Sequence, residues 1–191
     1  MGFTPPIQYG GIYHIYNRGN NRENLFIETR NYDYFLRLLV KHLLPVAELY
    51  AFCLLRNHFH LVAKIKTIDE QRIWYQENDI ESLAGWPRVP SRHFSNWFNA
   101  YTRGFNKTYQ RSGTLFQRPF SRKKIHSRSH FRRVIRYLHL NPIEHGFVET
   151  LEEWPFSSYL GLLSGDSSFL DREEVMRLFG GKEVFEDFHH T

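Results

Sequence analysis

Hydrophobic and polar positions in the first third of the chain alternate between strand-like and helix-like patterns. Residues 11–18 (GIYHIYNR) are rich in β-branched and aromatic side chains, which is typical of a strand. From Thr29 to Leu44, hydrophobic residues recur at spacings of three and four, which predicts an amphipathic helix that ends at Pro45. Residues 46–55 and 58–66 then predict two strands joined by a tight turn.

The same alternation continues in the rest of the chain. Residues 67–90 have a mixed pattern with Gly85, Pro87 and Pro90, which predicts a surface connection. The later elements predicted by periodicity are a helix at 91–110, a strand at 114–125 that bends at Pro119, a basic helix at 128–140 that Pro142 would end, and a short helix near 171–179.

The order strand, helix, strand, strand, helix, strand is that of a split βαβ unit. We therefore predict an α+β fold with an antiparallel sheet of ferredoxin-like or RRM-like topology and helices packed on one face. The helix that contains Tyr137 should lie beside the strand with His58 and His60. Residues 1–160 are expected to form one domain, and 161–191 an acidic C-terminal extension packed on it or trailing from it.

Composition limits the class of protein. Hydrophobic residues make up 41% of the chain and aromatic residues 17%, which is enough for a packed core. Cys53, the single cysteine, excludes a disulfide framework and is expected to be a buried thiol. The N-terminus does not resemble a signal peptide, and no segment approaches the ~18 hydrophobic residues of a membrane span. A cytoplasmic protein is expected.

Charge is distributed very unevenly along the chain. Residues 82–143 include thirteen Lys and Arg and no Asp or Glu, whereas residues 144–191 include three Lys and Arg and eleven Asp and Glu. Solvated surfaces normally mix both signs, and the basic stretch has the hydrophobic periodicity of folded chain. It therefore predicts a surface that binds nucleic acid.

Two features could supply chemistry. On a strand, His58 and His60 project from the same face and could bind one metal ion together, although two polar residues on a half-exposed strand would look the same. Tyr137 lies in the basic helix, and Asn141 follows one helical turn later. A phenol is a weak nucleophile unless its target is activated, and a cation on a phosphate would provide that activation. Alternatively, Tyr137 could be an aromatic residue of the core, and Asn141 followed by Pro142 could simply mark the end of the helix.

The segments CLLRNHFHLV (53–62) and IRYLHLNPIEHGFV (135–148) resemble those of the HUH-type single-tyrosine transposases, most of all the REP-associated tyrosine transposases. Residues 12–26, 112–123 and 154–159 support the resemblance, which extends from about residue 10 to 160. One departure is Arg56, which stands where many relatives have proline before the Asn-His pair. Arginine there offers a phosphate contact in place of a stiffened turn.

The resemblance implies a metal-dependent single-stranded DNA endonuclease and strand transferase. His58, His60 and Asn141 would bind Mg²⁺ or Mn²⁺, and Tyr137 would form a 5′-phosphotyrosine link and free a 3′-hydroxyl. The expected partner is a REP-like DNA hairpin with a short flanking tetranucleotide. The protein is expected to act as a monomer, with a dimer as the alternative.

Several basic residues are candidates for contact with DNA. They are Arg56, Arg118, Arg122, Lys123, Lys124, Arg133 and Arg136. Tyr16, Phe116 and Phe120 are candidates for base stacking, whereas the aromatic row of the helix at 91–110 has the spacing of core residues.

Two other functions fit part of the sequence. A non-catalytic RRM-like module would explain the basic charge and the fold, but it would give His58, His60 and Tyr137 no role. A replication-initiator or relaxase-type nickase would share the chemistry, and Tyr159 leaves room for a second tyrosine nucleophile.

Overall fold

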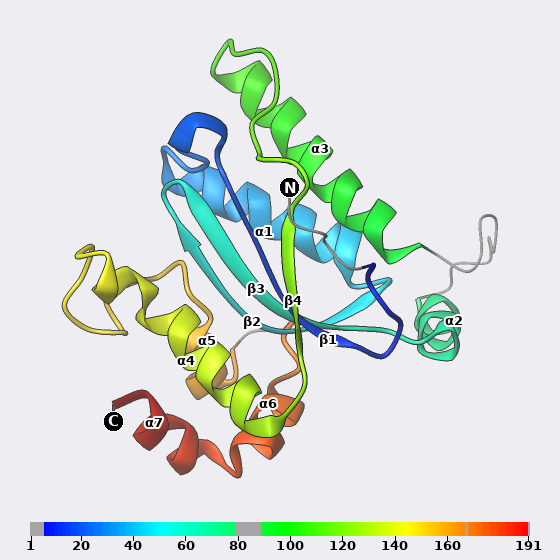
Figure 1. Cartoon of the computed structure of the whole chain (residues 1–191), viewed down its shortest axis with the longest axis vertical. Coiled ribbons are helices and arrows are strands. Elements are labelled where there is room, and N and C mark those ends of the chain that lie inside the picture. The colour runs from blue at the N-terminus through cyan, green and yellow to red at the C-terminus, as the bar shows by residue number, and fades with distance from the viewer. Residues whose placement is uncertain (1–5, 79–88, 167, 191) are drawn as a thin grey trace.

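A four-stranded antiparallel sheet forms the centre of the computed structural model, which describes residues 6–78, 89–166 and 168–190 (Figure 1). Its strands are β1 (Ile12–Arg18), β2 (Ala47–Leu55), β3 (His58–Ile65) and β4 (Ser121–Ile125), in the order β2-β3-β1-β4. β3 lies antiparallel between β1 and β2, so these two strands run parallel without touching. This arrangement confirms the split βαβ topology predicted from the order of elements.

The helices in the described residues are η1 (Asn20–Arg22), α1 (Thr29–Leu43), α2 (Ile68–Glu77), α3 (Pro90–Thr108), α4 (Arg128–Glu144), α5 (Tyr159–Ser164), α6 (Arg172–Phe179) and α7 (Lys182–His190). α2 lies in the predicted surface connection, whose Gly85 and Pro87 fall outside the described residues. Its start has a signal that the periodicity missed: Thr67 and Glu70 form a capping box. None of the described helices is long and apolar enough to cross a membrane.

Helices cover both faces of the sheet, so the prediction that they pack on one face was incomplete. Phe59 of β3 packs on the α1–α3 side, with its ring centroid 5.1 Å from that of Phe35 and 5.2 Å from that of Trp97. The next residue, His60, points the other way, and its ring centroid is 5.5 Å from that of Tyr137 in α4. Periodicity shows that a helix has a buried side, but not which face of the sheet it covers.

α4 continues through Pro142 and ends at Glu144, four residues later than predicted. Proline removes only its own N–H, and this close to the end of a helix the loss affects a single intrahelical bond. The backbone N–H groups of His145 and Phe147 still donate to the carbonyls of Asn141 and Pro142, at 3.0 and 2.9 Å. The last turn is therefore retained, and Asn141 lies inside the helix.

The strand predicted at 114–125 is shorter: β4, from Ser121 to Ile125, pairs continuously with β1, whereas the first half keeps an isolated bridge between Phe116 and Gly19. Phe116 turns into the core beside α3 and is 5% exposed, so it is not available for base stacking as expected. Phe120 is half-buried against Phe94, with a stacked ring at 5.5 Å.

The C-terminal residues pack against α4, and Figure 1 shows α4, α6 and α7 together at one end of the molecule. Val175, Phe179 and Phe185 belong to the common core. Arg132 of α4 donates hydrogen bonds to the carbonyls of Leu178 and Phe179 at the end of α6. Cationic donors at the C-terminal end of a helix satisfy carbonyls that have no intrahelical partner.

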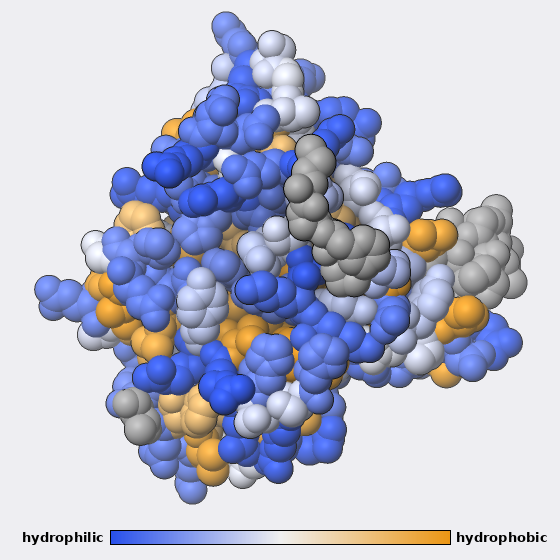
Figure 2. Space-filling view, in the orientation of Figure 1, coloured by the Kyte–Doolittle hydropathy of each residue, from blue (hydrophilic) through white to orange (hydrophobic). Residues whose placement is uncertain are grey.

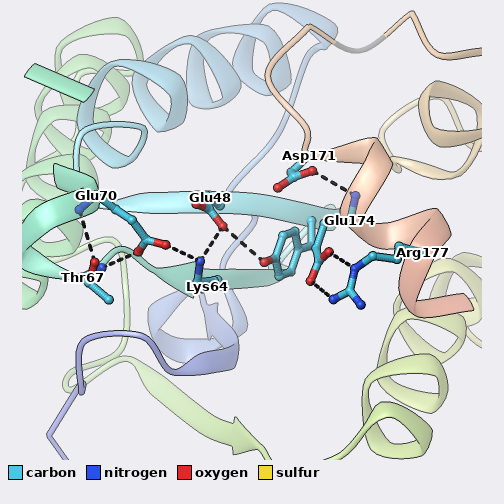
Figure 3. A network of polar contacts seen from close by, with 8 residues as sticks. Glu48, Lys64, Thr67, Glu70, Asp171, Glu174 and Arg177 are labelled. Carbon is cyan, nitrogen blue, oxygen red and sulfur yellow. Dashed lines mark hydrogen bonds and ion pairs between the residues drawn. The ribbon is translucent and has the colours of Figure 1, made fainter. Parts of the chain in front are cut away.

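Basic and acidic residues, which are unevenly distributed along the sequence, gather at opposite edges of the sheet. β4 at one edge is basic, whereas acidic residues gather beside β2 at the other edge (Figure 3). The N–H of Asp171 donates to the carbonyl of Leu49 in β2. There Lys64 bridges Glu48 and Glu70, at 3.1 and 2.7 Å. The face of the molecule seen in Figure 2 is mostly hydrophilic.

Replacing Arg132 by Ala should lower the free energy of unfolding by about 1–2 kcal/mol, because two carbonyls at the end of α6 lose a charged donor. Urea unfolding measures the change. Arg133→Ala is the matched control, since Arg133 is exposed one residue further along the same helix. Equal stability of the two variants would show that the α4–α6 contact depends on apolar packing alone.

Candidate active site

The residues predicted to take part in the reaction lie together where α4 packs on β2 and β3. His58 and His60 project from the same face of β3, with ring centroids 5.2 Å apart. Tyr137 of α4 lies over this face, its ring centroid 5.5 Å from that of His60, and its side chain is 43% exposed. The tyrosine is thus beside the histidines and remains open to a ligand from solvent.

His58 is oriented by its neighbour in the β2–β3 turn. Its Nδ1 lies 2.7 Å from Oδ1 of Asn57, and because an amide oxygen only accepts, Nδ1 bears the proton. Burial, followed by the charges of His145 and Arg18, lowers the pKa of His58 to about 4. The imidazole is therefore neutral near pH 7, with an unprotonated Nε2 that can bind a cation.

His60 is paired with His14 of β1, which the sequence did not single out. Nδ1 of His60 lies 2.9 Å from Nε2 of His14. Burial, with the charges of neighbouring histidines, lowers the pKa of His60 to about 2, and burial also lowers the pKa of His14 to about 4. Both rings are neutral, so one donates and the other accepts. When His60 donates, its Nε2 is left with a lone pair.

Asn141 contributes a buried oxygen that has no partner. The residue is 1% exposed, and its Nδ2 donates to the carbonyl of Tyr137 at 2.8 Å. Its Oδ1 has no hydrogen bond of good geometry among the described residues, although Asn141 lies close enough to His58 to raise the pKa of that imidazole. A buried acceptor without a partner costs about 1–3 kcal/mol, which a bound cation would offset.

These residues fit a divalent cation that also takes oxygen ligands from substrate and water. Two imidazole nitrogens and one amide oxygen are a suitable partial ligand set for Mn²⁺ and acceptable for Mg²⁺. Within the described ranges, no three His, Cys, Asp or Glu side chains are grouped to bind a metal. The protein would therefore supply an incomplete coordination sphere, as a metal that activates a substrate requires.

Of the seven basic residues predicted to contact DNA, Lys123 and Arg56 adjoin residues of this site. Lys123 pairs with His14 in the β1–β4 register, and its charge helps to lower the pKa of His14. Arg56 lies in the exposed turn before His58, with its guanidinium over the ring of Phe147 at 5.6 Å. Lys123 therefore lies on the histidine face of the sheet, and Arg56 lies in the turn that leads to His58.

The other five basic residues lie elsewhere. Strand alternation turns Arg122 and Lys124 to the opposite face from Lys123, where Lys124 donates to Gln8 at 2.7 Å. Arg118 is exposed in the loop before β4. On α4, Arg133 is exposed near Phe188, and the charge of Arg136 acts on His189. The structure therefore does not bring these five residues to the histidine pair.

The sequence did not identify two members of the site, His14 and His145. His14 occupies the position that faces Val62 across β1 and β3, from which its ring reaches His60. His145 follows the last residue of α4, with its ring centroid 5.3 Å from that of His58. The alternation of β1 indicated that His14 and Tyr16 share a face, but only the strand register shows that this face is the face of His60.

Comparisons with known proteins found similarity in sequence and in fold. No family model matches the chain. A Haemophilus influenzae protein assigned to the REP-associated tyrosine transposases is 28% identical over 117 residues, which are 59% of this chain. The match spans 58% of that relative's length, and it is therefore a partial one.

A solved structure of a REP-associated tyrosine transposase bound to a REP hairpin has a similar fold. It superposes with a TM-score of 0.62 and 19% sequence identity, over 86% of each chain. The resemblance suggested by the His-Phe-His and tyrosine segments is thus confirmed by an independent sequence match and by the fold. In sequence, this chain is similar to the Haemophilus influenzae protein over part of its length, and in fold it is similar to the solved hairpin-bound transposase.

Proposed function

We propose that this chain is a metal-dependent transposase that cleaves and transfers single-stranded DNA through a phosphotyrosine intermediate. The observation that supports this most directly is the position of Tyr137 beside the neutral His58 and His60, with the partnerless Oδ1 of Asn141 on the same helix. An exposed phenol next to an incomplete set of metal ligands suits attack on a phosphate held between them.

In the proposed reaction, Oη of Tyr137 attacks the phosphorus atom of one phosphodiester. A phosphorus–oxygen bond to the tyrosine forms as the bond to the 3′-oxygen breaks, which leaves a 5′-phosphotyrosine and a free 3′-hydroxyl. The phenolic proton passes to water, and the departing oxygen takes a proton from water. Because the number of phosphodiester bonds is conserved, a second 3′-hydroxyl can reverse the step on another strand without ATP.

The cation would be Mg²⁺ or Mn²⁺, bound through Nε2 of His58, Nε2 of His60 and Oδ1 of Asn141. When bound, it supplies Lewis-acid activation of the phosphate. The protein's own contribution is orientation: Asn57 and His14 fix the two imidazoles, and α4 fixes both Tyr137 and Asn141.

We further propose that the substrate is a hairpin-bearing single strand, as in the similar solved structure, and that the chain works as a monomer. The monomer is supported because Tyr137 meets His60 of its own chain, so the site needs no partner subunit. The RRM-like alternative needs an open sheet face, and here helices cover both faces.

Tyr159 does not support the nickase alternative, which would use a second tyrosine. The residue is 1% exposed and packs on His139 and Phe185. Burial raises its pKa to about 12. A nucleophile in this position could not meet a DNA phosphate.

Replacing Tyr137 by Phe should abolish the covalent DNA adduct and leave hairpin binding within about threefold, because only the attacking oxygen is lost and the ring is retained. Labelled single-stranded hairpin DNA with Mn²⁺, resolved on a denaturing gel, measures the adduct. Tyr16→Phe is the matched control, since Tyr16 lies on the same sheet face beside His60. An adduct in the Tyr137 variant would assign the nucleophile to another residue.

Replacing Asn141 by Ala should weaken Mn²⁺ binding roughly 10- to 100-fold, the range for lost metal support, because the buried Oδ1 is removed. Asn141→Asp should retain or strengthen binding, since a carboxylate is a better ligand for hard cations. Cleavage rate against Mn²⁺ concentration measures both variants, and high Mn²⁺ should partly restore the Ala variant. Superimposable curves for the three proteins would mean that Asn141 only forms part of the helix.

Lys123 and Lys124 provide a matched pair for the DNA surface. Lys123→Ala should flatten the log–log salt dependence of single-strand binding by about 0.7, the slope for one neutralised phosphate. Lys124→Ala should leave the slope unchanged, because Lys124 faces the other side of β4 and bonds Gln8. Fluorescence anisotropy at several salt concentrations measures both slopes. Equal slopes for the two variants would contradict a DNA path over the histidine face.

A further inference from the structure

We propose that His139 and His189 are positioning residues for Tyr137, and that the C-terminal helix α7 acts as a clamp that fixes the tyrosine helix. This inference deepens the proposed function and depends on it for the role of Tyr137. It rests on a buried chain of hydrogen bonds that joins β2, α4 and α7 behind the candidate active site.

The chain of hydrogen bonds passes through three buried side chains. Nδ1 of His139 in α4 lies 2.8 Å from Nε2 of His189 in α7. On its other side, Nε2 of His139 lies 2.8 Å from Oγ of Ser158, which accepts a 2.9 Å hydrogen bond from the N–H of Phe52 in β2. The three side chains are 1–2% exposed, so water does not compete for these contacts.

The contact at one end of this network determines which atom donates and which accepts in each of its hydrogen bonds. Nδ1 of His189 lies 2.7 Å from the carbonyl of Phe185, which only accepts, so this nitrogen has the proton. Burial lowers the pKa of His189 to about 4, so the ring is neutral and its Nε2 accepts from Nδ1 of His139. Because Nδ1 of His139 donates, its Nε2 is the acceptor that faces the hydroxyl of Ser158 at 2.8 Å.

The Ser158 hydroxyl lies 2.8 Å from Nε2 of His139 and also 3.2 Å from the carbonyl of Phe52, which accepts from the N–H of Ser158 at 2.9 Å. Such a network fixes the rotamer of His139 and one tautomer of its ring. It thereby fixes the rotation of α4 and its position along its axis relative to β2.

The network acts on the side of α4 away from the DNA-facing tyrosine. Residues two apart on a helix point in nearly opposite directions, so His139 is directed inward where Tyr137 is directed outward. Apolar contacts of Phe131, Ile135 and Leu138 also hold α4, but they have no preferred direction and tolerate a small rotation. Directional bonds at His139 are what would keep Tyr137 and Asn141 in register with His58 and His60.

Two substitutions of His189 separate positioning from packing. His189→Leu keeps an apolar side chain in place but removes the acceptor for His139. His189→Gln keeps an acceptor at about the position of Nε2. His190→Ala is the control, since His190 is the exposed next residue of α7, with one 3.3 Å contact to Tyr159.

For each protein, we would measure the single-turnover rate of adduct formation at saturating hairpin DNA, the Kd for DNA, the melting temperature, and hydrogen exchange in α4. The Leu variant should form adduct roughly 10- to 100-fold more slowly, as expected for a misplaced nucleophile, with Kd within about twofold and faster exchange at 135–144. The Gln variant and His190→Ala should stay within about threefold of the wild-type rate.

Two outcomes would overturn the proposal. One is an unchanged rate in the Leu variant. The other is an equal loss in the Leu and Gln variants with faster exchange throughout the chain, since general destabilisation would explain it. If the wild type forms no adduct at all, the proposed function is wrong, and hydrogen exchange alone tests the α7 clamp. Faster exchange limited to α4 in the Leu variant would then support the clamp, and unchanged exchange would refute it.

Discussion

The alternation of side chains along β3 is the constraint on which the rest of the structure depends. Phe59 and Leu61 enter the core formed with α1 and α3, and this forces His58 and His60 onto the opposite face. A shift of one residue in register would bury the histidines in the aromatic core and expose Phe59. The hydrophobic driving force that builds the core thus also positions the candidate metal ligands.

α4 connects the chemistry to the core. Its inward side contributes Phe131, Ile135 and Leu138 to packing, while Tyr137 is directed to the histidines. Because Asn141 lies one turn after Tyr137, a movement of this helix would displace the attacking oxygen and a metal ligand together. A helix with both functions needs a fixed position, and α6 and α7 support it from the side away from the site.

The two edges of the sheet have opposite charge. Basic β4 forms one edge, whereas the carboxylates beside β2 pair with Lys64 and Arg177 at the other (Figure 3). A polyanion would be attracted to the first edge and repelled from the second, which would favour one orientation of approach. The exposed ion pairs at the acidic edge contribute little to stability.

The sequence by itself determined the order of the sheet strands and of the helices α1, α3 and α4, and the residue pairs of the candidate site, but it did not predict α2, α5 and α7. Helical and strand periodicity located α1, α3, α4 and the three longer strands, because local burial patterns reflect local geometry. Spacing placed His58 with His60 and Tyr137 with Asn141, since each pair lies on one element. The sequence did not predict three contacts between elements. They are the face of the sheet that α4 covers, the strand register that brings His14 to His60, and the hydrogen bond between His139 and His189. These depend on how separate segments pack, and only the tertiary structure decided them, because packing is set by the shapes of many side chains at once and no local pattern records it.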